Sequence, residues 1–159
     1  MRNRWWLIPE LAVAGTLLML YLGGFGGDGT DAIARQAAAV IEQSSPTEHA
    51  AHGHEVSADD QIFCGMHVFG VRGQTVYGYY FCALGRPGVP YLESSRIDGP
   101  VVVTLGPTPS AYIAPPGEGY RETVKAMMPD EYEQYCFSGL PDPSVAAGVR
   151  ERYVQALGA

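Results

Sequence analysis

The sequence predicts an α+β domain behind an N-terminal transmembrane helix, with a small antiparallel sheet of about four strands packed by C-terminal helices. Three observations support this prediction. The stretch Trp5–Phe25 is apolar over twenty-one residues and contains one charged residue, Glu10. Runs of aromatic and β-branched residues follow between residues 62 and 114, and from Gly117 onward apolar residues recur at helical spacing. Strands followed by helices are typical of the α+β class.

The apolar stretch is long enough to cross a membrane, because a helix of this length extends about 31 Å and a bilayer core is about 30 Å thick. Arg2 and Arg4 precede the stretch, whereas Asp28 and Asp31 follow it. The positive-inside bias therefore places the N-terminus in the cytoplasm. We expect residues 1–27 to be the cytoplasmic tip and anchor of a single-pass cell-membrane protein whose C-terminal domain is extracytoplasmic. A cleaved signal peptide begins in the same way and is the alternative.

The next segment, residues 28–60, is expected to join the anchor to the folded domain. Apolar residues at helical spacing predict a juxtamembrane helix over Asp31–Gln43, which a serine pair and Pro46 are expected to end. Residues 44–60 are poor in large aliphatic side chains and are interpreted as a histidine-containing linker. The extracytoplasmic α+β domain is then expected to span residues 61–159.

Two β-rich runs, Ile62–Val71 and Thr75–Leu84, are predicted to form a hairpin. Three residues, including Gly73, lie between them and suit a bulged turn that sets Val71 opposite Thr75. Both faces of the hairpin are apolar, so we expect the hairpin to be covered on both sides or to lie at an interface. Two shorter strands are expected to follow, the second confined to an edge by its flanking prolines: Val101–Leu105 and Ala111–Ala114.

Three helical segments are predicted in the last third of the chain. The first begins after Gly117 and ends at Pro129. A short second segment is expected over Asp130–Phe137. Asp142 is expected to cap the third segment, Pro143–Leu157, which carries proline at its first helical position.

The predicted hairpin places Cys64 directly opposite Cys82, with both side chains on the same face. Opposed residues in a non-hydrogen-bonded antiparallel pair have Cα atoms about 4.5 Å apart, within reach of a disulfide. An oxidising extracytoplasmic compartment would allow the bond to form. We therefore predict a Cys64–Cys82 disulfide and a free thiol at Cys136.

The charge balance favours some classes of function over others. Ten Lys+Arg against seventeen Asp+Glu give a formal net charge of −7, and an acidic domain repels phosphate backbones. We therefore expect no nucleic-acid partner. Neither a G-x-S-x-G nor an H-E-x-x-H pattern occurs, so a non-catalytic binding domain or accessory subunit is the leading hypothesis. Its expected partner is a protein or a larger membrane complex, and a small extracytoplasmic hydrolase is the third hypothesis.

A metal-binding or metal-sensing envelope protein is the second hypothesis. It rests on His49, His52 and His54, three imidazoles within six residues that could gather around Zn²⁺ or Cu²⁺. The surrounding alanine- and glycine-containing segment supplies no groups that would orient these imidazoles. We therefore expect weak metal binding and no tightly bound cofactor.

The tyrosines suggest a place for a protein partner. Nine of the ten lie between Tyr77 and Tyr153, where they can serve core packing or an aromatic binding surface. On the second interpretation, the partner-binding residues are those on one face of the second strand: Tyr77, Tyr79 and Phe81.

The sequence also carries a resemblance. A cysteine-containing strand, the runs VYGYYFC and PVVVTL, and a P-G-x-G-Y pattern leading into a helix ended by proline lie between Cys64 and Pro129. This layout resembles small, uncharacterised, membrane-anchored extracytoplasmic proteins of high-GC Gram-positive bacteria. The group has no assigned activity, so the resemblance implies an anchored, non-enzymatic domain and supplies no catalytic residues.

Overall fold

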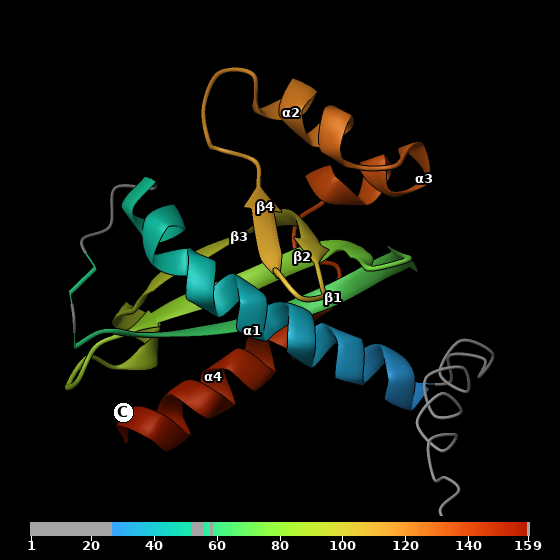
Figure 1. Cartoon of the computed structure of the whole chain (residues 1–159). Coiled ribbons are helices and arrows are strands. Elements are labelled where there is room, and N and C mark those ends of the chain that lie inside the picture. The colour runs from blue at the N-terminus through green and yellow to red at the C-terminus, as the bar shows by residue number, and fades with distance from the viewer. Residues whose placement is uncertain (1–26, 52–55, 58, 159) are drawn as a thin grey trace, which may run out of the picture.

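The computed structural model of the chain describes residues 27–51, 56–57 and 59–158 (Figure 1). Its centre is one four-stranded antiparallel sheet with the strand order β1-β2-β3-β4, so that β1 and β4 form the two edges. The strands are β1 (Gln61–Arg72), β2 (Thr75–Gly85), β3 (Ser95–Thr104) and β4 (Ser110–Ile113). The predicted α+β class, with about four antiparallel strands and C-terminal helices, is confirmed.

One face of the sheet is covered by α1 (Gly27–Ala51), which lies across the strands (Figure 1). Ala37, Val40 and Ile41 of this helix join a single buried cluster with side chains of all four strands. The hairpin residues of that cluster share the sheet face under α1: Cys64, Met66, Val76, Tyr80 and Cys82. The folded core therefore includes residues that precede Gln61 in the sequence.

The helix runs further than predicted, since it continues through Pro46 to Ala51 instead of ending before the serines. Pro46 lies inside the helix, where proline has no N–H to donate to the carbonyl of Glu42. The helix continues past this missing hydrogen bond to Ala51. The predicted linker is thus helical at its beginning.

The opposite face of the sheet is covered by the C-terminal helices. They are α2 (Tyr120–Met127), α3 (Asp130–Glu133), the 3₁₀ turn η3 (Gln134–Phe137) and α4 (Pro143–Leu157). Val149 and Tyr153 of α4 pack with Phe63 and Ala83 of the sheet, whereas α2 and η3 build a separate cluster nearer the other end. Both faces of the hairpin are covered, as predicted.

The start of α4 agrees with the prediction. The carboxylate of Asp142 accepts a hydrogen bond of 2.8 Å from the backbone N–H of Ser144, and Pro143 is the first helical residue. Such a cap satisfies one of the N–H groups that the first turn of a helix leaves without a partner.

The hairpin turn differs from the prediction. Arg72 pairs with Thr75, so the turn has two residues, Gly73 and Gln74, and the predicted pairing of Val71 with Thr75 is wrong. Two-residue hairpin turns favour a positive φ, and Gly73 supplies one of 61°.

A bulge in β1 restores the predicted register further along the hairpin. The pairing shifts by one residue between Val68 and Gly70, and beyond this point Cys64 lies opposite Cys82. The extra residue in β1 compensates for the shorter turn. The predicted pairing of the two cysteines is therefore confirmed although the predicted turn is wrong.

The third strand is longer than expected, beginning at Ser95 with Gly99 and Pro100 inside it. Proline is compatible with a strand where no neighbour needs its N–H. Here β4 pairs only with Val101–Thr104, so Pro100 has a neighbouring strand on one side alone. The edge position predicted for the fourth strand is confirmed.

The predicted transmembrane stretch lies outside the described residues. Among the helices that the structure describes, none combines the length and the apolar character needed to cross a bilayer.

Candidate functional site

The predicted disulfide between Cys64 and Cys82 is present in the centre of the hairpin, with Cα atoms 4.1 Å apart. Both cysteines have no exposed surface. The third cysteine, Cys136, is a free thiol in the cluster beneath α2, and its burial raises the pKa of the thiol to about 11. A thiol with a raised pKa is a poor nucleophile at neutral pH, so Cys136 has the character of a packing residue.

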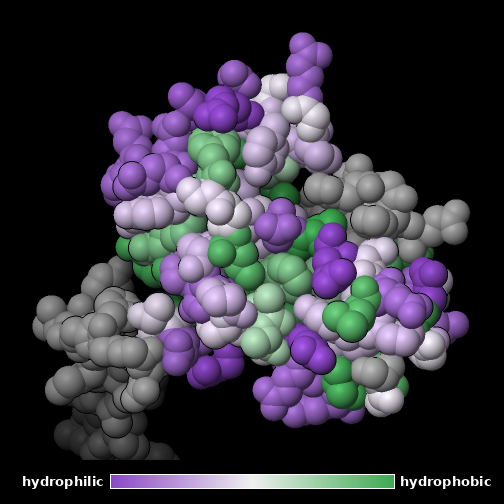
Figure 2. Space-filling model, turned by 180° about the vertical axis from the view of Figure 1, so that it is seen from behind, coloured by the Kyte–Doolittle hydropathy of each residue, from purple (hydrophilic) through white to green (hydrophobic). Residues whose placement is uncertain are grey.

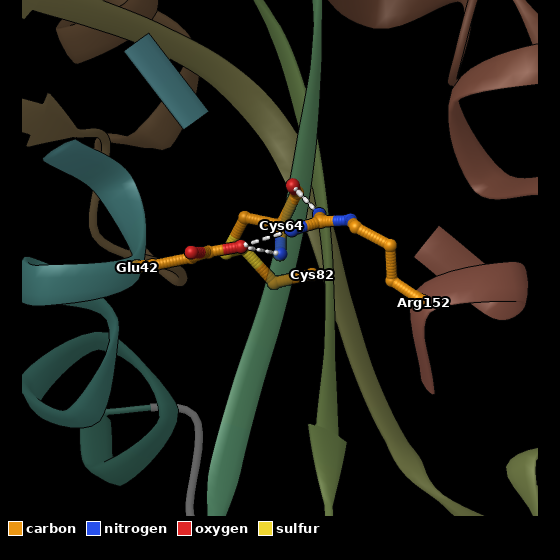
Figure 3. A network of polar contacts seen from close by, with 4 residues as sticks. All are labelled: Glu42, Cys64, Cys82 and Arg152. Atoms are coloured by element: carbon orange, nitrogen blue, oxygen red, sulfur yellow. Dashed lines mark hydrogen bonds and ion pairs between the residues drawn. A yellow bond between two sulfur atoms is a disulfide. The ribbon is translucent and has the colours of Figure 1, made fainter. Parts of the chain in front are cut away.

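Beside the disulfide, the outer edge of β1 is occupied by two side chains (Figure 3). The backbone N–H of Cys64 donates a hydrogen bond of 2.8 Å to Glu42 Oε1, and the carbonyl of Cys64 accepts one from Arg152 Nη2. Both backbone groups therefore point away from β2. In an antiparallel pair this outward orientation recurs at every second residue, so the backbone groups of Ile62 and Met66 face the same edge.

Glu42 and Arg152 also bind each other, with Arg152 Nη1 donating to Glu42 Oε1 over 2.9 Å. Glu42 belongs to α1 on one face of the sheet, and Arg152 belongs to α4 on the other. The two side chains are 28% and 46% exposed, respectively, so the pair is in contact with water. This ion pair, which we call the edge bridge, joins the two helical layers across the open edge of the sheet.

A groove of about 520 Å³ lies between α1 and α4 on one side of the edge bridge. Its floor is β1 from Cys64 to Met66, and its walls on α1 and α4 are rich in small residues: Ala34, Ala38, Ala39, Ser144 and Gly148. Charged groups of both signs line it as well: Asp31, Arg35, Glu42, Glu151 and Arg152. A second hollow, of about 640 Å³, lies on the other side of the bridge against Gln61–Phe63.

The region combines open backbone groups with small side chains and charges. The floor offers backbone donors and acceptors, and the walls offer small apolar surfaces with charges around them. Among the described residues, no group outside the sheet forms a hydrogen bond with the backbone of Met66, which lines the groove. Backbone groups at an open strand edge can pair with an added chain. A ligand that supplied hydrogen bonds along β1 would therefore complete this edge.

The predicted metal ligands lie mostly outside the described part of the chain. His52 and His54 fall there, and of His49 only the backbone is described, in the last turns of α1. Among the described side chains, no group of three or more His, Cys, Asp or Glu stands close enough to hold a metal ion. Metal binding by the three histidines stays a prediction.

The three aromatic residues predicted to bind a partner lie under the C-terminal helices. Tyr77 packs with the α2–η3 cluster and Phe81 with the α4 cluster, both half-buried. Tyr79 is 5% exposed, and its hydroxyl donates a hydrogen bond of 2.8 Å to Asp98. Burial and, after it, Asp98 raise the pKa of Tyr79 well above its usual value. In the structure Tyr77 and Phe81 contact the protein's own helices, and Tyr79 is buried with its hydroxyl on Asp98 of β3.

Large apolar side chains at the surface are dispersed. The five most exposed ones come from five different elements or loops: Val71, Leu92, Tyr112, Tyr135 and Val154. The face opposite to that of Figure 1 accordingly shows green hydrophobic areas interspersed with purple hydrophilic ones (Figure 2). Singly exposed apolar side chains are normal on a soluble surface and do not by themselves mark a binding site. The groove along β1 is therefore the stronger candidate site.

Sequence reasoning missed the edge bridge. Glu42 and Arg152 are separated by 110 positions, and each looks like an ordinary charged residue on a helix surface. The apolar stripes of the two helices predict that each helix packs on the domain. They do not predict that both helices lie beside the same edge of β1, because this depends on the tertiary fold.

No protein-family model, curated protein or solved structure matches this chain.

Proposed function

We propose that this chain is a single-pass membrane protein whose extracytoplasmic domain binds a protein partner without catalysing a reaction. The observation that carries the binding role is the groove between α1 and α4, with backbone groups of β1 along its floor. The partner is either a separate extracytoplasmic protein or a subunit of a larger membrane complex.

The disulfide supports the extracytoplasmic location. Cys64 and Cys82 are bonded in the interior of the domain, and structural disulfides form and persist mainly in oxidising compartments outside the cytosol. The sequence before the domain supports the anchor, since it begins with two arginines and a long apolar stretch. Together they favour a domain held at the outer side of the membrane.

The surroundings of the groove favour binding over catalysis. Its charged side chains include the edge bridge, in which a carboxylate and a guanidinium neutralise each other. No histidine, cysteine thiol or tyrosine lines the described groove, since its one cysteine is in the disulfide. The Ser144 hydroxyl and the carboxylates of Asp31 and Glu151 also line the groove, but the described lining offers Ser144 no histidine to act as the usual base.

Native pull-down of the tagged full chain from membranes in a mild detergent tests the proposal. We compare the wild type with Gly148→Trp, which puts a large ring into the groove, and with Ala147→Trp, which puts the same ring on the adjacent solvent-exposed position of α4. The expected result is a protein that co-purifies with the wild type and with Ala147→Trp but is depleted with Gly148→Trp. Recovery of the same proteins with all three chains and with an unrelated tagged membrane protein would contradict the proposal.

A further inference from the structure

The open edge of β1 specifies the shape of the ligand that fits the groove. β1 pairs with β2 on one side only, and the N–H and carbonyl of every second residue point outward. The groups of Cys64 are engaged by side chains, whereas those of Met66 have no outside partner among the described residues. An extended polypeptide presents alternating donors and acceptors at this same two-residue spacing.

The walls of the groove agree with such an occupant. Small residues line both sides, with Ala34 and Ala38 on α1 and Ser144 and Gly148 on α4. A strand laid along β1 sends alternate side chains toward α1 and toward α4, because successive side chains leave a strand on opposite faces. Small walls leave space for those side chains on both faces. The mixed charges around the groove, which include Arg35 and Glu151, suit a polar segment without a strong net charge.

The edge bridge occupies the position that a strand added along β1 would take beside Cys64. At Cys64, one carboxylate accepts the N–H and one guanidinium donates to the carbonyl, which is the pair of bonds that a neighbouring strand would provide. Hollows lie on both sides of the bridge along β1. Both side chains are partly exposed, so each can turn toward water and stay solvated. Moving the bridge aside would join the two hollows into one channel from Gln61 to Met66.

We propose that the partner binds by adding an extended segment of its chain to the edge of β1, between α1 and α4, and that the edge bridge covers this edge in the free domain. Glu42 and Arg152 hold the backbone of Cys64 until the incoming strand takes over both hydrogen bonds. An edge strand left uncovered is prone to pair with other chains, and a side-chain cover of this kind limits such pairing. This mode of binding rests on the proposed function.

The test uses the full chain in mild detergent, with a displayed library of random peptides of about ten residues, the length of a long strand, as the probe. Peptides selected on the wild type are expected to slow amide hydrogen exchange of Ile62–Val68 and to bind about tenfold or more weaker to Gly148→Trp, but not to Ala147→Trp. Removing the bridge with Glu42→Ala plus Arg152→Ala is expected to tighten binding about threefold or more, because the free edge loses its cover. Arg150→Ala, which removes another arginine of α4, is expected to leave the affinity unchanged.

Several results would overturn strand addition. They are a library that yields no binder, binders that leave exchange along β1 unchanged, and a bridge-free variant that binds more weakly while retaining wild-type circular dichroism and the disulfide. Each of these results can be distinguished from a failure of the proposed function. A partner that co-purifies in the pull-down and is lost with Gly148→Trp, yet leaves exchange along β1 unchanged, keeps the groove as a binding site and excludes strand addition.

Discussion

Glu42 and Arg152 meet across the edge of β1 and together bind both backbone groups of Cys64, whose side chain is in the buried disulfide. One residue therefore connects three layers of the fold: α1 through the carboxylate, α4 through the guanidinium and β2 through the sulfur. Disturbing any of these contacts affects the edge that we propose as the docking site.

The disulfide is the first point to test by mutation. Replacing both Cys64 and Cys82 with alanine is expected to lower the free energy of unfolding by about 3 kcal/mol, the loss that chain entropy gives for a loop of this size. Denaturant unfolding under non-reducing conditions measures it. Cys136→Ala, which removes a buried sulfur but no cross-link, is the control and should cost less. Non-reducing peptide mapping that links Cys136 to either of the other cysteines would contradict the pairing.

Gly78 is expected to be sensitive to substitution, because a Cβ there would lie 2.2 Å from the carbonyl oxygen of His67, a backbone atom that cannot turn away. Gly78→Ala should therefore destabilise the domain by roughly 1–3 kcal/mol, the range for overpacking. Gly148→Ala is the matched control, since a Cβ there meets nothing within 4 Å and alanine favours a helix interior by about 0.5–1 kcal/mol. Thermal unfolding of the two variants should shift in opposite directions. Equal shifts would argue against the close approach of β1 and β2 at Gly78.

The free energy of unfolding of the domain should fall in acid, partly because Asp60 becomes protonated. Arg86 donates two hydrogen bonds of 2.9 Å to its carboxylate, and these hold the pKa of Asp60 well below its usual value. A carboxyl group with a lower pKa in the folded state stabilises the fold above its unfolded pKa, about 3.9, and loses this effect as the pH falls through the folded pKa. Asp60→Asn should therefore lower the Tm at pH 7 and have a smaller effect near pH 2.

The control for that prediction is Asp59→Asn, which changes the neighbouring exposed carboxylate. Its effect on the Tm should be small at both pH values, as for most surface positions. A Tm difference for Asp60→Asn that is the same at pH 7 and pH 2 would show that the ion pair with Arg86 does not contribute through its charge.

The histidine segment is expected to bind divalent metal weakly. Calorimetric titration of the full chain with Zn²⁺ and with Cu²⁺ should give affinities too weak for a resident metal, and a triple replacement of His49, His52 and His54 by alanine should remove the residual heat. A one-to-one site with a Kd below about 1 μM that depends on these histidines would favour the metal-binding hypothesis over the binding-domain proposal.

The features that sequence predicted well depend on local chemistry. Asp142 followed by proline defines the start of α4 because both residues act on the first turn alone. The Cys64–Cys82 pairing was predicted from the alternation of side chains along two paired strands. The pairing is correct although the predicted turn is wrong, because the bulge near Phe69 adds the residue that the shorter turn lacks.

The features that sequence missed depend on contacts between distant segments. Pro100 was expected to lie just before the third strand, and only the short reach of β4 makes a strand possible there. Tyr77 and Phe81 are of a residue type common at interfaces, but helices later in the chain pack against both. The edge bridge needs α1 and α4 on opposite faces of the sheet, an arrangement that the periodicity of neither helix specifies.

The most direct test of the central claim is photo-crosslinking in intact cells that express the full chain. Benzoylphenylalanine placed at position 148 faces the groove, whereas the same group at position 147 faces solvent on the adjacent residue of α4. We expect position 148, but not position 147, to form an adduct with one extracytoplasmic protein. The adduct should map to a short extended segment of that protein. Adducts of equal yield from both positions, or none from position 148, would contradict the claim that this groove binds a protein partner.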